Sequence, residues 1–233
     1  MTTNSARVSL LVLAAVAIAF SQCAYAHNVS SSNANYLASV EGPAVALFIY
    51  LGAKHMVTGV DHLLYLLAVV FLAFRVRDIV ALVSLFALGH SITLILGVWL
   101  SVQVNPSLVD GIIGFSIAYK AYENLGGFKA LNPYVVPAGV AVFTFGLVHG
   151  LGLATKLQAV YSGGDGLLVN LIAFNVGVEL GQLLALAALL AVLAVLRRQS
   201  SFRYWSQGLN LTLLVCGFMF AGFHWFDLVL RGN

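Results

Sequence analysis

Long apolar stretches constrain the fold of this chain more than any other feature of its sequence. Six of them cover residues 43–74, 79–100, 111–125, 134–156, 167–196 and 204–230. A bilayer core of about 30 Å needs about 20 apolar residues per helix. The sequence therefore predicts an all-α, polytopic membrane helix bundle with six transmembrane spans, forming one domain over residues 43–233. Only 8% of the residues are charged, which is too few to coat a soluble protein and excludes a nucleic-acid-binding or disordered chain.

The first stretch is too long for one straight span. At 1.5 Å per residue, an unbroken helix over residues 43–74 would measure about 48 Å. Kinks need an identifiable cause, and glycine is one of them. We expect the first span to be kinked or broken, with Gly52 and Gly59 as the candidate positions.

The first 26 residues have the pattern of a cleavable secretory signal peptide. An apolar stretch is followed by Ala24-Tyr25-Ala26, the small-x-small pattern of a cleavage site. Cleavage there leaves residues 27–42 as a short periplasmic leader that begins with His27. It also leaves Cys216 as the only thiol, so neither an intrachain disulfide nor a cysteine-based metal site is expected.

Basic residues in the loops predict the orientation of the chain. With the mature N-terminus outside, the loops on the inner side carry Arg75, Arg77, Lys129, Arg197, Arg198 and Arg203, whereas the outer side carries Lys156 and Arg231. Basic residues are enriched in cytoplasmic loops. We therefore expect a multi-pass protein of the bacterial inner membrane with both mature termini in the periplasm.

Ionisable residues inside the apolar stretches are the main indication of function. Each costs roughly 2.5 to 3.5 kcal/mol near the bilayer centre and so needs a partner or a purpose. Counted from the predicted membrane faces, six of them fall near mid-depth: Asp61, His62, His90, Glu123, His149 and Glu179. Single polar residues often only join helices, and Asn124, Gln182 and His224 fit that simpler interpretation. Six potential ligands at one depth favour one shared site.

Spacing indicates how some of these side chains are arranged. His55 and His62 lie seven residues apart, on one helix face and about 10.5 Å apart along the axis, which predicts two successive stations unless the helix unwinds at Gly59. Asn175, Glu179 and Gln182 form a stripe predicted to face the bundle interior. His27 and His224 are candidates for the outer start of such a path.

Glycines accompany the polar positions, and the ligand types indicate a class of ion. Gly146 and Gly150 flank His149, while Gly177 and Gly181 bracket Glu179, at spacings that let neighbouring helices approach closely. Imidazole nitrogen with carboxylate oxygen, without thiolate, suits divalent nickel, cobalt or zinc rather than monovalent copper.

Five blocks of sequence together resemble the HupE/UreJ family. They are the segments at residues 55–64 (HMVTGVDHLL), 89–94 (GHSITL), 123–124 (EN), 145–150 (FGLVHG) and 174–179 (FNVGVE). The resemblance implies a protein with a signal peptide and six to seven spans, a nickel or cobalt permease linked to hydrogenase and urease maturation. It marks His55, Asp61 and His62 as the first signature, with His90, His149 and Glu179 as later positions. Met56 replaces the usual proline, as in a divergent second branch of the family.

The leading hypothesis is a membrane permease, not an enzyme, that moves nickel by preference, or cobalt, from periplasm to cytoplasm. The metal is substrate rather than a tightly bound cofactor. Its expected ligands are His55, Asp61, His62, His90 and His149, with Glu123 and Glu179 offsetting charge. Hydrogenase or urease maturation proteins are the expected partners.

Three other functions stay open at the level of sequence. An intramembrane zinc-dependent hydrolase could use His90-Ser91 beside Asp61-His62. A b-type haem protein could take axial ligands from His62, His90 and His149. A metal-sensing accessory protein would bind the ion without transporting it.

Overall fold

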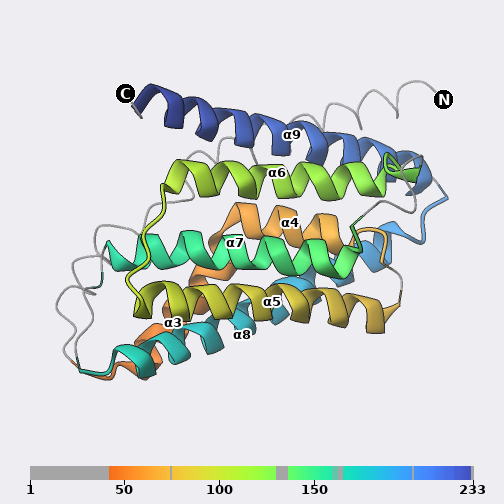
Figure 1. Cartoon of the computed structure of the whole chain (residues 1–233). Coiled ribbons are helices and arrows are strands. Elements are labelled where there is room, and N and C mark those ends of the chain that lie inside the picture. Colours follow the sequence, from red (N-terminus) through yellow and green to blue (C-terminus); the bar gives the residue numbers. More distant parts are fainter. Residues whose placement is uncertain are drawn as a thin grey trace.

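A computed structural model describes residues 42–73, 75–129, 136–159, 161, 165–200 and 202–231. This part of the chain contains seven α-helices and no β-strand (Figure 1). The helices are α3 (Val45–Thr58), α4 (Val60–Val70), α5 (Val76–Trp99), α6 (Pro106–Asn124), α7 (Ala138–Gln158), α8 (Leu167–Leu196) and α9 (Phe202–Arg231). The predicted signal peptide, nearly all of the predicted leader and His27 lie outside the described residues. The prediction of an all-α protein is confirmed.

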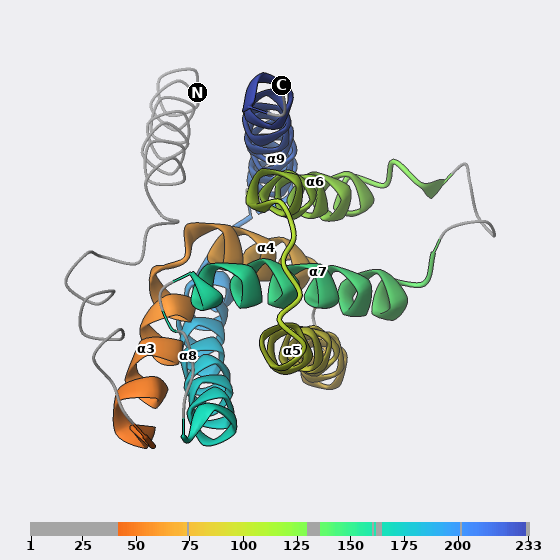
Figure 2. The ribbon, with the colours of Figure 1, turned by 60° about the vertical axis from the view of Figure 1, so that its left-hand side comes forward.

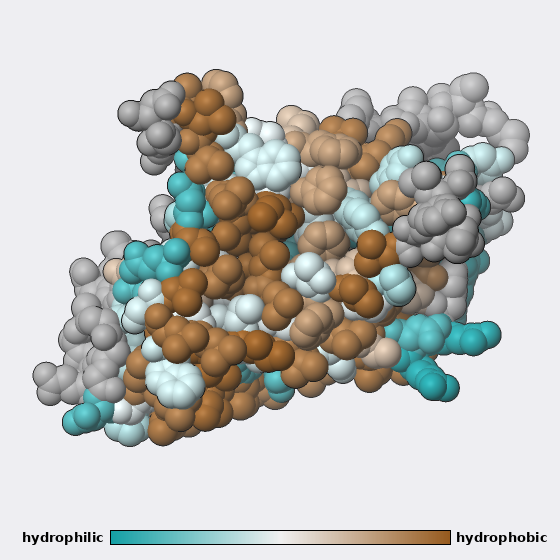
Figure 3. All heavy atoms as spheres, in the orientation of Figure 1, coloured by the Kyte–Doolittle hydropathy of each residue, from teal (hydrophilic) through white to brown (hydrophobic). Residues whose placement is uncertain are grey.

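The composition of the helices and of their exposed faces identifies a membrane protein. Helices α5, α7, α8 and most of α9 are long and apolar enough to cross a bilayer, whereas α3 and α4 are apolar but shorter. Large apolar side chains such as Leu180, Leu183 and Leu184 are exposed on α8. Figure 3 shows hydrophobic residues over most of one face of the molecule, with hydrophilic residues gathered toward its two ends. Such a face suits contact with lipid rather than water.

The first predicted span is divided into α3 and α4 by Gly59. Its backbone is extended, with φ −72° and ψ 101°, so α3 ends at Thr58 and α4 begins at Val60. The Gly59 N–H still donates a 2.9 Å hydrogen bond to the carbonyl of His55. The predicted break is therefore confirmed at Gly59, while Gly52 lies within α3.

Three closely packed helix pairs, α3 with α8, α5 with α7 and α6 with α9, build the bundle (Figure 2). Glycines make this contact possible, because a Cβ atom at Gly177 would collide with the Ile49 carbonyl and one at Gly150 with the His90 carbonyl. The close approach predicted from the glycine spacing is confirmed for both pairs of glycines.

Successive passes through the bundle alternate in direction (Figure 1). Helices α3, α4, α6 and α8 run one way, and α5, α7 and α9 run back. One end of the bundle holds Lys156 in the last turn of α7, and we call it the Lys156 end. The opposite end holds Arg197, which follows α8 directly, and we call it the Arg197 end.

Helix α6 begins five residues before the predicted third span. The Asn105 side chain caps it by accepting hydrogen bonds from the N–H groups of Ser107 and Leu108, at 2.9 and 3.4 Å. Pro106 follows at the first helical position, where its missing N–H costs nothing. The predicted start at residue 111 is wrong because hydropathy alone ignores these capping residues.

Arg197 closes the end of the half-helix α4. Its Nη2 lies 2.8 Å from the carbonyl oxygens of Val70 and Phe71 and 2.9 Å from that of Ala73. These carbonyls lie at the end of α4 and just beyond it, where they have no intrahelical partners. The two hydrogens on Nη2 are shared among these three carbonyl oxygens. These hydrogen bonds hold the end of α4 to the end of α8.

We expect Arg197→Ala to lower the free energy of unfolding by about 3 kcal/mol, because it leaves buried carbonyls without a charged donor. Thermal unfolding of the purified protein in detergent measures this loss. Arg198→Ala is the matched control, since Arg198 is exposed one residue further along. Equal melting temperatures for the two variants would contradict the assigned role of Arg197.

Candidate metal centre

Four imidazole rings meet in the middle of the bundle. They come from four different helices and are His55 on α3, His62 on α4, His90 on α5 and His149 on α7. His62 is central, with its ring centroid 4.9 Å from that of His55, 6.0 Å from that of His90 and 5.2 Å from that of His149. We call these four residues the histidine cluster.

The break at Gly59 brings His55 into this cluster. In a continuous helix the two rings would stand two turns apart, but the extended backbone at Gly59 lets His62 fold back beside His55. The predicted alternative, in which the helix unwinds at Gly59, is therefore the one observed, and His55 and His62 are neighbours rather than two successive stations.

Three of the four histidines are buried, and several ring nitrogens of His62 and His90 lack hydrogen bonds. His62, His90 and His149 are 5%, 1% and 2% exposed. Among the described residues, neither ring nitrogen of His90 has a hydrogen-bond partner, and the same holds for Nε2 of His62. A buried polar group left unsatisfied costs about 1 to 3 kcal/mol. Such groups therefore call for an explanation other than stability.

His149 is oriented for ligation by the turn that precedes it. Its Nδ1 lies 2.8 Å from the carbonyl oxygen of Phe145. A carbonyl only accepts, so in the neutral ring the proton sits on Nδ1 and the lone pair on Nε2. A fixed tautomer of this kind is how proteins present imidazole to a metal.

Asp61 places a carboxylate beside the cluster. It is 3% exposed, and its Oδ2 lies 3.2 Å from Nδ1 of His62, close enough for an ion pair but not aligned as a hydrogen bond. It stands in the first turn of α4, where the helix dipole favours a negative charge. Half-helices that begin inside a bundle form the ion sites of many transporters.

An aromatic layer covers the cluster on the side of the Arg197 end. It consists of Tyr65, Phe86 and Phe145, each three or four residues from a clustered histidine toward that end. The Tyr65 ring lies 5.2 Å from Phe86 and 6.0 Å from Phe145. The Phe86 ring is also in edge contact with His149 at 5.0 Å. The histidine cluster is therefore closed by packed rings in this direction.

The side chains of the cluster do not converge on one point as they stand. Within the described part of the chain, no group of three His, Cys, Asp or Glu side chains is arranged to hold a metal ion. The rings pack edge to face instead, for example at 76° between His55 and His62. Since metal–nitrogen bonds measure about 2.0 to 2.1 Å, binding requires these rings to turn their lone pairs inward.

Two predicted members of the site lie elsewhere. Glu179 is exposed on α8. The buried face of α8 includes Phe174, Val178 and Gly181, and Glu179 lies outside that face. Glu123 is the penultimate residue of α6, and its Oε2 lies 2.7 Å from Nζ of Lys120. The prediction that Glu179 faces the bundle interior is therefore wrong, and Glu123 lies near the end of α6 beside Lys120 rather than in the histidine cluster.

Asn124 and Gln182, which were interpreted as joining helices, form hydrogen bonds to neighbouring helices. Nδ2 of Asn124 donates to the Ala68 carbonyl at 2.8 Å and to Oδ1 of Asn210 at 2.9 Å, which ties α6 to α4 and α9. Nε2 of Gln182 donates to the Val83 carbonyl of α5 at 3.1 Å. The simpler interpretation of Asn124 and Gln182 is confirmed.

One buried carboxylate was not among the predicted site residues. Asp110 is 4% exposed on α6 and lies 2.7 Å from Nζ of Lys156 and 3.9 Å from Nδ1 of His224. It lies one residue before the predicted third span, so it was not counted among the polar residues of the spans. The Asn105-Pro106 cap would have placed it inside a helix, one turn after Ser107.

The fold and site together define a class: an all-helical membrane protein with a buried, multi-helix cluster of histidines at mid-bundle. Residues 31–227 of the chain match the model of a known protein family, described as HupE / UreJ protein. The match covers most of the chain, and the protein belongs to this family, whose general assignment is to nickel or cobalt transport or to an accessory role. Neither the curated proteins nor the solved structures give a significant match.

Proposed function

We propose that this protein is a permease for a divalent transition-metal ion, with nickel preferred and cobalt as the alternative. The observation that carries the proposal is the meeting of four imidazoles from four helices beside the carboxylate of Asp61. Ionisable groups at mid-depth are expensive in a membrane and typically mark ion pathways. The metal is the substrate, and its ligands are the histidine cluster and Asp61.

The ligand set favours nickel, cobalt or zinc over other ions. Four imidazoles and one carboxylate provide borderline nitrogen donors with a single hard oxygen ligand. Magnesium and calcium prefer sites built from oxygen, and monovalent copper prefers sulfur. The described thiol, Cys216, lies in α9 and belongs to neither the histidine cluster nor the aromatic layer. One carboxylate against a divalent ion also keeps binding weak enough for release.

The membrane arrangement that supports transport has six passes. Helices α3 and α4 form the first pass together, and α6, with 19 residues, completes the set with the four long apolar helices. We place the Lys156 end in the periplasm and the Arg197 end in the cytoplasm of a bacterial inner membrane, because basic residues are enriched on the cytoplasmic side. Both mature termini are then periplasmic.

Transport in this scheme runs from the Lys156 end to the Arg197 end. The aromatic layer lies on the release side of the histidine cluster, so the ion passes only when Tyr65 and its neighbours separate. Helix α4 carries both His62 and Tyr65. One movement of this half-helix would therefore displace a metal ligand and open the aromatic layer at the same time. Broken helices serve this purpose in other transporters.

The proposed physiological role is to supply metal for maturation of a hydrogenase or urease, as the family assignment suggests. No contact among the described residues favours the hydrolase or the haem hypothesis, whereas a sensor would use the same histidine cluster and differs only in the absence of transport. A visible Soret band in the purified protein would indicate haem, and retention of one zinc per chain would favour the hydrolase.

Uptake by proteoliposomes tests the proposal. Purified protein reconstituted into liposomes should take up radioactive nickel above the level of empty liposomes. An excess of cobalt should compete strongly and an excess of magnesium should not. Uptake equal to that of empty liposomes, under conditions in which the protein is folded, would exclude a permease and leave the sensor hypothesis.

A further inference from the structure

The aromatic layer contains a buried hydroxyl group that the proposed ligand set does not use. Tyr65 is 2% exposed, and its hydroxyl has no hydrogen-bond partner among the described residues. The other two rings of the layer, Phe86 and Phe145, carry no polar atom. A buried hydroxyl without a partner is costly, and phenylalanine would fill nearly the same space without that cost. The hydroxyl of Tyr65 therefore calls for an explanation other than packing.

Tyr65 lies directly beside the histidine cluster, on the side of the Arg197 end. It follows His62 by three residues on α4, which places it on the same helix face and about one turn nearer that end. Its ring centroid lies 5.5 Å from that of His149 and 5.2 Å from that of Phe86. An ion that leaves the cluster in the proposed direction therefore passes Tyr65 first.

Beyond Tyr65, polar side chains of α6 continue toward the Arg197 end. The Phe145 ring lies 6.0 Å from Tyr65 and 5.6 Å from Tyr119 of α6. One turn after Tyr119, Glu123 is paired with Lys120, and the Glu123 side chain is 28% exposed. Glu123 is also near enough for its charge to act on the Tyr65 phenol. Tyr65 thus stands between the histidine cluster and a partly exposed carboxylate near the Arg197 end.

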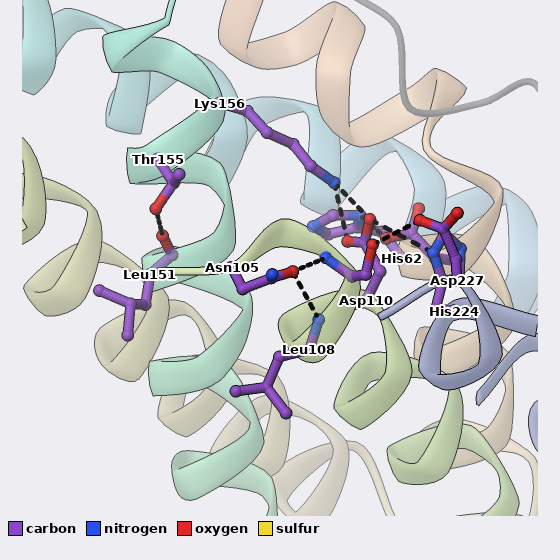
Figure 4. Close-up of polar contacts among 11 residues, drawn as sticks. His62, Asn105, Leu108, Asp110, Leu151, Thr155, Lys156, His224 and Asp227 are labelled. Atoms are coloured by element: carbon purple, nitrogen blue, oxygen red, sulfur yellow. Dashed lines mark hydrogen bonds and ion pairs between the residues drawn. The ribbon is translucent and has the colours of Figure 1, made fainter. Parts of the chain in front are cut away.

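The approach from the Lys156 end is built differently. Figure 4 shows Lys156 and His224 pointing toward Asp110 from α7 and α9. Nζ of Lys156 donates to both carboxylate oxygens of Asp110, at 2.7 and 3.0 Å. The charged groups on this side are therefore held by one another. The three rings of the aromatic layer, in contrast, offer a passing ion a single polar side-chain atom, the hydroxyl oxygen of Tyr65.

The chemistry of a phenol suits brief contact with a hydrated divalent ion. An ion that gives up imidazole ligands takes water in their place, and water bound to a divalent cation is a strong hydrogen-bond donor. A neutral phenol oxygen accepts such a bond, and its own O–H can donate to a second water. It carries no charge that would hold the ion, so the contact stays weak enough for release.

We propose that Tyr65 acts directly on the moving ion: its hydroxyl accepts a hydrogen bond from water bound to the ion as the ion leaves the histidine cluster through the aromatic layer. The proposal rests on the proposed function, because it requires release toward the Arg197 end. The ring of Tyr65 closes the path, whereas its hydroxyl lowers the barrier to crossing the layer. Loss of the hydroxyl should then slow transport without weakening binding.

Tyr65→Phe removes the hydroxyl and keeps the ring. The layer is the closed part of the path, so its crossing limits the rate. We expect nickel uptake by proteoliposomes to fall about tenfold, the effect of one lost hydrogen bond on the slow step. Nickel binding to the purified protein in detergent, measured by equilibrium dialysis, should be unchanged. The melting temperature should equal or exceed that of the wild type, because a buried unsatisfied group is removed.

Tyr50→Phe is the matched control, since it makes the same chemical change on an exposed surface. Tyr50 is 58% exposed on α3, and we expect normal uptake and normal binding in this variant. His62→Ala provides the opposite reference, because loss of a ligand should weaken nickel binding as well as uptake. Comparison of the three variants separates a residue that acts during passage from a ligand of the resting site.

The outcomes distinguish this inference from the proposed function. Uptake by Tyr65→Phe equal to that of the wild type would overturn the role of the hydroxyl and leave the permease intact. A lower melting temperature, failure to fold or weaker nickel binding in Tyr65→Phe would show that the hydroxyl serves the structure or the resting site, and would also overturn it. Absence of uptake by the wild type would contradict the proposed function, and this inference with it.

Discussion

Replacing His62 by alanine should reduce nickel uptake into proteoliposomes at least about tenfold, the largest effect that we expect from any single substitution of a ligand. His62 is the ring that contacts both His55 and His149 directly and lies 6.0 Å from His90. Its removal takes one donor from the site and leaves the others without their common neighbour. His90→Ala should have a similar effect, since both ring nitrogens of His90 lack hydrogen bonds among the described residues.

Glu179→Gln distinguishes loss of a ligand from a general effect of altering a polar residue in the bundle. Glu179 is exposed on α8, so we expect near-normal uptake in this variant. Thermal unfolding of all three variants should confirm that they remain folded. Normal uptake in folded His62→Ala would contradict the assignment of the histidine cluster, whatever the result for Glu179→Gln.

The second large effect is expected at Gly177, where α8 crosses α3. A Cβ atom there would collide with the Ile49 carbonyl, a backbone atom that cannot turn aside. Gly177→Ala must push the two helices apart, and we expect a loss of stability at or above the upper end of the about 1 to 3 kcal/mol typical of overpacking. Thermal unfolding in detergent measures it, and nickel uptake should fall because α3 carries His55.

Gly222→Ala is the matched control for this prediction. A Cβ atom at Gly222 of α9 meets nothing within 4 Å, and alanine is favoured over glycine in a helix by about 1 kcal/mol. We therefore expect Gly222→Ala to be neutral or slightly stabilising. A Gly177→Ala variant that melts at the same temperature as Gly222→Ala would show that the α3–α8 contact is looser than described.

The fold was largely predictable from the sequence because bilayer thickness limits the length of a helix. An excess length over residues 43–74 and a glycine at position 59 were enough to predict a broken first span. The glycine spacing on α7 and α8 likewise predicted close helix contacts. The start of α6 was missed because Pro106, Ser107 and Asp110 interrupt the apolar stretch there, and the cap formed by Asn105 and Pro106 was the signal that could have placed it.

The candidate site was less predictable, because sequence spacing gives depth but not direction. His62, His90 and His149 were expected to meet at mid-depth, and their rings do. Glu179 shares that depth, yet it lies outside the buried face of α8, which is set by packing against α3. His55 joined the cluster only through the backbone conformation of Gly59, which periodicity cannot supply.

X-ray absorption spectroscopy of the purified, nickel-loaded protein tests the central claim most directly. A metal bound by the histidine cluster should give a first shell of nitrogen and oxygen without sulfur, and an outer-shell signal from several imidazoles. The imidazole signal should fall in His62→Ala and persist in Asp110→Asn. A nickel shell made only of oxygen, or an imidazole signal unchanged in His62→Ala, would contradict the claim that these four histidines gather to bind the ion.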